Sequence, residues 1–177
     1  MKIVRCMLPV LVAVVIASAP LAAQQKPPLS PPGEASVKFD DGKTVTIKYS
    51  RPSMRGRKIY GELVPYGKVW RTGANAATSL TTDTALDIGG TTVPAGNYTL
   101  YSVPGEKSWQ LIVNKQTGQW GTKYDEGQDL ARVPMKVSQL PSGLETFTIS
   151  LNKTGAKSAT LKLDWELTSA SVNIAEK

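Results

Sequence analysis

Apolar and polar residues alternate along much of the chain from residue 35 onward, which is the period of a β-strand with one buried face. Near the C-terminus, for example, Leu161, Leu163, Trp165 and Leu167 point to one side, and Lys162, Asp164 and Glu166 point to the other. We expect Trp109 and Trp165 to lie in the core. Comparable runs predict about ten short strands, over residues 35–39, 44–49, 68–71, 78–82, 85–88, 98–103, 109–114, 133–137, 146–151, 160–166 and 169–174.

Turn residues separate these runs. Asp41-Gly42 and Gly89-Gly90 are two-residue hairpin signals, and residues 104–108 join the most regular pair of strands. No stretch has the period of a long helix, and residues 125–130 favour one helical turn at most. Because a sheet with one apolar face must bury that face, we predict an all-β fold. It would be an antiparallel two-sheet sandwich or a jelly-roll-like barrel, with one long basic loop over residues 51–78.

The first residues have the pattern of an export signal. Lys2 and Arg5 precede an apolar run over residues 7–17, and small residues up to Ala23 resemble a cleavage site. We therefore predict a signal peptide over residues 1–23 and an exported protein, either periplasmic or secreted. The alternative is a leader that is not cleaved and remains as an N-terminal anchor.

The rest of the chain is expected to hold one domain. Residues 24–33 are rich in proline and lack an apolar period, which predicts an extended tether. Residues 34–177 are enough for one hydrophobic core and too few for two. The leader's apolar run is too short for a good membrane span and no other stretch qualifies, so no span is expected in the mature chain.

The composition excludes several kinds of chemistry. The chain has no histidine, and its one cysteine, Cys6, lies in the predicted leader. Without these residues the mature chain cannot form the usual zinc or copper sites, a Ser-His-acid triad or a cysteine nucleophile. We expect no cofactor and no metal ion, and the composition favours binding over catalysis.

The net charge is concentrated in one segment. Residues 51–71 carry six cations and one acid, Glu62, within a chain whose net charge is +7. Lys2 and Arg5 account for two further positive charges, so the rest of the chain is balanced, with thirteen cations and thirteen acids. A charge concentrated in one segment predicts a site for an anion.

The cations of this segment flank turns and strand ends, where their side chains reach a cleft at the rim of the sheet. Guanidinium groups close together bind carboxylate, phosphate or sulfate, and Tyr66 and Trp70 are able to stack on a sugar. We expect the ligand to be an anionic small molecule or a cell-envelope glycan. The predicted ligand-binding residues are Arg51, Arg57, Tyr66, Lys68, Trp70, Arg71 and Asn75.

Two other functions remain open at this point. The same arginines would act only as a structural clamp if they formed ion pairs with Asp125, Glu126 or Asp129. A hydrolase based on carboxylates or lysine is the third hypothesis, and it needs two carboxylates facing each other across a pocket. Nucleic acid is not expected as a partner, because the basic segment matches no recognition motif.

Four stretches carry a resemblance to a known family. They are YSRPSMRGRKIYGELVPYGKVWRTGANAAT, IGGTTVPAGNYTLYSVPG, WQLIVNKQTGQWG and YDEGQDLARV, and they resemble the bacterial family catalogued as domain of unknown function 2911. The resemblance covers roughly Ser30 to Ile174. It implies an exported all-β domain from a bacterium, with no established activity. The family's pattern usually has an acid after the Gly-Ala-Asn bend, where this chain has Ala76.

Overall fold

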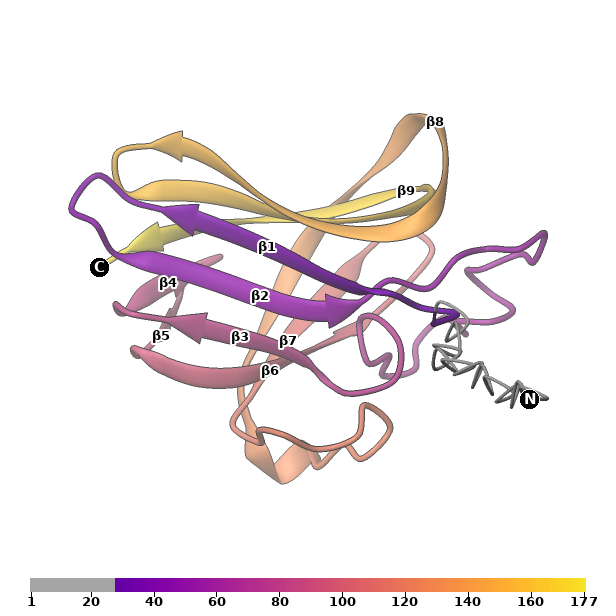
Figure 1. Ribbon diagram of the computed structural model, residues 1–177, viewed down its shortest axis with the longest axis horizontal. Coiled ribbons are helices and arrows are strands. Elements are labelled where there is room, and N and C mark those ends of the chain that lie inside the picture. Colours follow the sequence, from indigo (N-terminus) through magenta and orange to yellow (C-terminus); the bar gives the residue numbers. More distant parts are fainter. Residues whose placement is uncertain (1–27) are drawn as a thin grey trace, which may run out of the picture.

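The structure is a computed structural model that describes residues 28–177 (Figure 1). The predicted signal peptide, residues 1–23, and the tether as far as residue 27 lie outside the described residues. Nine strands and one short 3-10 helix follow. They are β1 (Pro32–Lys38), β2 (Thr44–Ser50), β3 (Thr78–Thr82), β4 (Leu86–Ile88), β5 (Thr91–Val93), β6 (Gly96–Val103), β7 (Trp109–Asn114), η1 (Glu126–Gln128), β8 (Asp129–Gly155) and β9 (Ser158–Glu176).

All nine strands are antiparallel and belong to one sheet, in the order β1-β2-β3-β6-β7-β8-β9-β4-β5. The predicted all-β antiparallel fold is therefore confirmed, whereas a division into two separate sheets is not. The continuity comes from β8, a strand of 27 residues. Its first residues pair with β7, and the residues from Lys136 onward pair with β9.

The sheet folds over itself because β8 curls from the side of β7 across to the layer that it forms with β9 (Figure 1). A hydrogen-bonded contact between the two halves marks this closure. The Tyr49 hydroxyl of β2 donates to the carbonyl of Ile149 in β8 at 3.3 Å and accepts from its N–H at 2.8 Å. The two halves thus enclose one core.

The core is apolar and aromatic, as the alternation predicts. Trp109 and Trp165, expected to be buried, are each 1% exposed. Leu167, predicted to share the face of Trp165, is exposed instead, because Glu166 has a φ of 55° and the register of β9 against β8 shifts there. The strands β6 and β7 are buried on both faces, because the loop after β7 covers their outer side. Within this cover the Thr99 hydroxyl donates to the carbonyl of Gln116, and the Tyr101 hydroxyl donates to that of Lys123.

Five predicted strands differ from the observed ones. The four runs predicted over residues 133–137, 146–151, 160–166 and 169–174 belong to only two long strands, β8 and β9. Pro141 and Gly143 break the alternation within β8, but they lie at an irregularity of register between Gln139 and Leu144 and do not end the strand. The strand predicted over residues 68–71 is a single bridge between Trp70 and Ser102.

None of the helices in residues 28–177 is long and apolar enough to cross a membrane.

Candidate functional site

Residues 51–77 connect β2 to β3 without a regular strand or helix. This connection lies at the end of the sheet opposite the C-terminus (Figure 1). Three isolated bridges fix it to the sheet and to the loop after β7, namely Ser53 with Thr146, Trp70 with Ser102, and Ala76 with Trp120. The connection is therefore held at three separate points.

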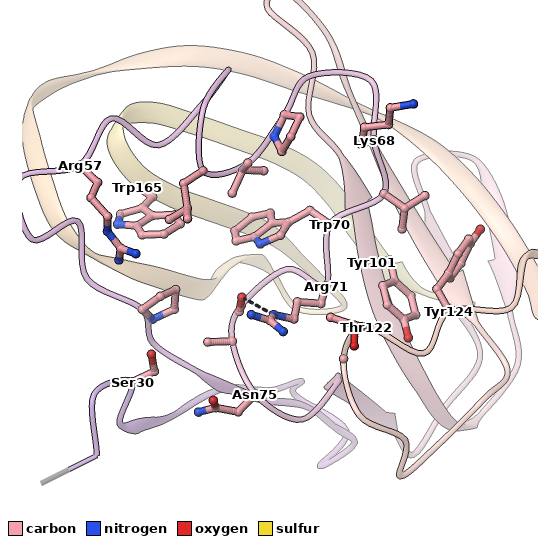
Figure 2. Close-up of a pocket in the computed structure, with 18 of the residues that line it drawn as sticks. Ser30, Arg57, Lys68, Trp70, Arg71, Asn75, Tyr101, Thr122, Tyr124 and Trp165 are labelled. Carbon is pink, nitrogen blue, oxygen red and sulfur yellow. Dashed lines mark hydrogen bonds between the residues drawn. The ribbon is translucent and has the colours of Figure 1, made fainter.

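A pocket of about 700 Å³ opens between this connection and the loop after β7 (Figure 2). Its volume is within the range of about 300–1,000 Å³ that is usual for small-molecule sites. The polar side chains on its wall are Ser30, Arg57, Lys68, Arg71, Asn75 and Thr122. Most of the remaining lining is aliphatic or aromatic, and includes Leu29, Leu63, Val69, Trp70, Tyr101 and Trp165.

Of the seven residues predicted to bind a ligand, the structure brings five together. Arg57, Lys68, Trp70, Arg71 and Asn75 all line the pocket. Figure 2 shows Arg57 and Arg71 directed toward the same hollow, whereas the amino group of Lys68 points away from it.

The other two predicted residues, Arg51 and Tyr66, are not among the pocket-lining residues. Arg51 ties the connection to β8, since its Nε donates to the carbonyl of Phe147 at 3.4 Å and its Nη2 to the Thr148 hydroxyl at 3.1 Å. The Tyr66 ring lies over Gly61, where a Cβ would come within 3.1 Å of the ring. The cations of the segment therefore do not form one cluster.

The pocket wall is positively charged. It contains Arg57, Lys68 and Arg71 and, among the residues described, no aspartate or glutamate. Among the described residues, Arg57 donates only to backbone carbonyls, those of Met54 and Ser53, each at 2.9 Å. Arg71 is partly buried, and its one hydrogen bond within residues 28–177 is a long one, from Nε to the carbonyl of Gly73 at 3.4 Å (Figure 2).

The acids expected to neutralise these arginines have other partners. Arg132 forms ion pairs with both Glu126, at 2.7 Å, and Asp129, at 2.8 Å. The Asp125 carboxylate accepts from the N–H of Gly127. Across the described part of the chain, no ion pair joins an acid to Arg51, Arg57 or Arg71, so a clamp made of such ion pairs is not formed there.

A buried glycine sets the position of Arg71. A Cβ on Gly121 would lie 2.6 Å from Arg71 Cδ and 2.8 Å from the carbonyl oxygen of Asn75, so only glycine leaves room for the arginine side chain here. The N–H of Gly121 donates to that same carbonyl at 3.0 Å. The sequence did not reveal Gly121 because its loop has no periodic pattern and Gly121 lies fifty residues from Arg71 along the chain.

The backbone next to Arg71 is strained. Thr72 has a φ of 52° and Asn75 a φ of 58°, and the left-handed region is costly for a β-branched residue such as threonine. Two hydrogen bonds hold Thr72 in place. Its hydroxyl donates to the Ser102 hydroxyl at 2.9 Å, and its carbonyl accepts from the Thr78 hydroxyl at 2.8 Å. Strain of this kind, about 1–3 kcal/mol per residue, is concentrated at functional sites.

Trp70 is held rigidly by other aromatic side chains. Its ring is stacked on Trp165, with centroids 5.9 Å apart and an interplanar angle of 17°, and it packs edge-on against Phe147 at 5.0 Å. Figure 2 shows the indole nitrogen on the side of Arg71. This N–H has no hydrogen-bond partner within the described residues, whereas that of Trp165 donates to the carbonyl of Glu145. Trp70 thus offers the pocket a donor at a fixed position.

The hydroxyl of Tyr124, another lining residue, is already hydrogen-bonded to neighbouring side chains. Its hydroxyl donates to Asp129 Oδ2 at 2.6 Å and accepts from Arg132 Nη2 at 2.7 Å. Burial, together with the hydrogen bond to Asp129, raises the pKa of Tyr124, which favours the neutral form. In residues 28–177 no group of three His, Cys, Asp or Glu side chains lies together as a metal site would require.

Two of the three comparisons with known proteins gave nothing: no curated protein and no solved structure matches this chain. The third, against family models, matches the family described as "Protein of unknown function (DUF2911)" over residues 30–174. The resemblance found in the sequence is therefore confirmed. Ala76, where the family's pattern usually has an acid, is exposed and is not among the pocket-lining residues. Because the matched region covers most of its length, the chain belongs to the DUF2911 family of proteins of unknown function.

Proposed function

We propose that this protein is exported, to the periplasm or the medium, and binds a small anionic ligand in the pocket without catalysing a reaction. Export is supported by the leader pattern of residues 1–23. The anion would be held by Arg71, with Arg57 and the Trp70 N–H as further donors. The other polar groups on the wall, Asn75 among them, would bind the remaining oxygens of the ligand.

The state of Arg71 is the observation that carries this proposal. Its guanidinium group is partly buried, and within the described residues it has no carboxylate partner and only one long hydrogen bond. A charge removed from water without a partner raises the free energy of the folded state. An anion in the pocket would supply that partner through charge-assisted hydrogen bonds.

The pocket lining supports binding more than hydrolysis. A carboxylate-based hydrolase needs two acids facing the substrate, and the residues described around this pocket include no acid. Lys68, the lining lysine, is exposed and points away from the hollow (Figure 2). A sugar acid remains a candidate ligand because Ser30, Asn75 and Thr122 are able to hydrogen-bond its hydroxyl groups.

A thermal-shift screen tests the proposal. The panel would contain phosphate, sulfate, citrate, simple carboxylates and uronic acids at constant ionic strength, and one or more of these should raise the melting temperature. Arg71→Met should weaken binding of the hit about ten- to a hundredfold, because a hydrogen bond to a charged group contributes about 1.5–3 kcal/mol. Without ligand, the variant should be as stable as the parent protein or more so.

Lys43→Met is the matched control. It removes the same charge from the turn between β1 and β2, at the other end of the sheet (Figure 1), and should leave binding unchanged. Equal losses in the two variants would show a general charge effect and would contradict the proposal. So would a large loss of stability in ligand-free Arg71→Met, because it would show that Arg71 serves the fold.

A further inference from the structure

Three exposed aliphatic side chains line the pocket. Of the six large hydrophobic side chains exposed in the described residues, Leu29 (71% exposed), Leu63 (45%) and Val69 (39%) line it. A fourth, Tyr66, follows the lining residue Pro65. Single exposed apolar side chains are ordinary, but a contiguous group of them marks an interaction site. A hydrated anion gives these side chains nothing to contact.

We propose that the ligand is an anionic amphiphile, with its acidic head at Arg71 and its apolar chain against Leu63, Val69 and Leu29. The inference rests on the proposed function, because it takes the anion site as given and adds the class of molecule. Leucine and valine side chains cannot hydrogen-bond sugar hydroxyls, so their exposure in the pocket lining favours a hydrocarbon chain over a glycan.

Charge and volume favour the same occupant. Arg57, Lys68 and Arg71, with no acid among the described lining residues, select for a negative charge. A volume of about 700 Å³ is far more than one carboxylate or phosphate group occupies, so such an ion alone would leave the apolar wall wet. An amphiphile would place its acidic head against the cationic residues of the pocket and its hydrocarbon chain against the apolar ones.

Titration calorimetry with straight-chain carboxylates tests this inference. Acetate, butyrate, hexanoate, octanoate and decanoate would be titrated below their micelle concentrations, at one pH and ionic strength. Each added methylene should tighten binding about two- to fourfold until the apolar wall is covered. Leu63→Ser should weaken decanoate binding about tenfold and leave acetate unchanged.

Leu167→Ser is the matched control for the leucine variant. Leu167 has the same exposure, 45%, and is not among the residues that line the pocket. Its replacement should leave decanoate binding unchanged. An equal loss in both leucine variants would show non-specific adsorption and would overturn the inference.

The remaining outcomes separate the two proposals. If acetate binds as tightly as decanoate and both depend on Arg71, the amphiphile is refuted and the anion site stands. If decanoate binds equally well to Arg71→Met, the anion site itself is refuted, and with it the inference that rests on it.

Vesicles distinguish the source of the amphiphile. The protein would be mixed with phosphatidylglycerol vesicles and with phosphatidylcholine vesicles, and sedimentation would report binding. Binding to the anionic vesicles that is lost in Leu63→Ser supports the inference and identifies a bilayer lipid as the ligand. Binding of free decanoate without vesicle binding supports it with a free amphiphile. The absence of both overturns it.

Discussion

Two buried tyrosines in one core should respond in opposite ways to the loss of a hydroxyl group. Tyr49 and Tyr60 are both buried. The Tyr49 hydroxyl bonds both the N–H and the carbonyl of Ile149, whereas the Tyr60 hydroxyl has no partner within residues 28–177. Phenylalanine keeps the ring and its aromatic contacts in each case. The pair of variants therefore isolates the hydroxyl group.

The expected change in unfolding free energy depends on which hydrogen-bonding groups lose a partner when each hydroxyl is removed. Tyr49→Phe strands two backbone groups of Ile149 between the halves of the sheet and should cost about 1–3 kcal/mol of unfolding free energy. For a domain of this size that is a fall in melting temperature of about 2–4 °C per kcal/mol. Tyr60→Phe removes an unsatisfied polar group, so stability should stay the same or rise by about 1 kcal/mol.

Urea unfolding followed by tryptophan fluorescence measures both effects. The midpoint should fall for Tyr49→Phe and stay or rise for Tyr60→Phe, with an unchanged slope in each case, because neither variant alters the surface exposed on unfolding. A loss of more than about 1 kcal/mol in Tyr60→Phe would show that its hydroxyl has a partner after all. A neutral Tyr49→Phe would show that its contact between β2 and β8 contributes nothing.

Two further predictions concern the pocket and the response to alkaline pH. Gly121→Ala should displace the Arg71 side chain and weaken anion binding about tenfold by calorimetry, an effect the size of one hydrogen bond. In the control Gly143→Ala the new Cβ meets nothing within 4 Å, so anion binding should be unchanged. Equal binding by the two variants would refute the role of Gly121 in positioning Arg71. Burial raises the pKa of Tyr60 and of Tyr124 above the usual value of about 10 for tyrosine, so the stability that each contributes should be complete below about pH 10 and decline as the pH rises further. Urea midpoints across this range should fall less steeply for Tyr60→Phe than for the parent protein, and parallel curves would contradict the assignment.

The alternating pattern predicted the class of fold but not the lengths of the strands. Alternation identifies which side chains are buried, and Trp109 and Trp165 lie in the core as expected. Whether a break in the alternation ends a strand depends on whether the neighbouring strand keeps pairing with it. Pro141 and Gly143 resemble a turn along the chain, yet β8 and β9 keep pairing on both sides of the irregularity.

The candidate site was predictable only in part, for a similar reason. Charge counting located the segment with Arg57 and Arg71, because a local excess of charge is visible along the chain. The partners of each cation are not visible there. Glu126 and Asp129 pair with Arg132, which follows them within six residues, and not with distant arginines. Gly121 could not be found, because its role depends on a contact between two loops far apart in sequence.

The long strand β8 also constrains how a ligand reaches the pocket. Since β8 is hydrogen-bonded to β7 at one end and to β9 along the rest, the two halves of the sheet share a strand and have no linker between them. Separating the two halves would break the backbone hydrogen bonds of β8 and the hydrogen bond between Tyr49 and Ile149. Access therefore depends on side chains and loops at the pocket's own opening, and uptake should proceed without a domain-scale rearrangement.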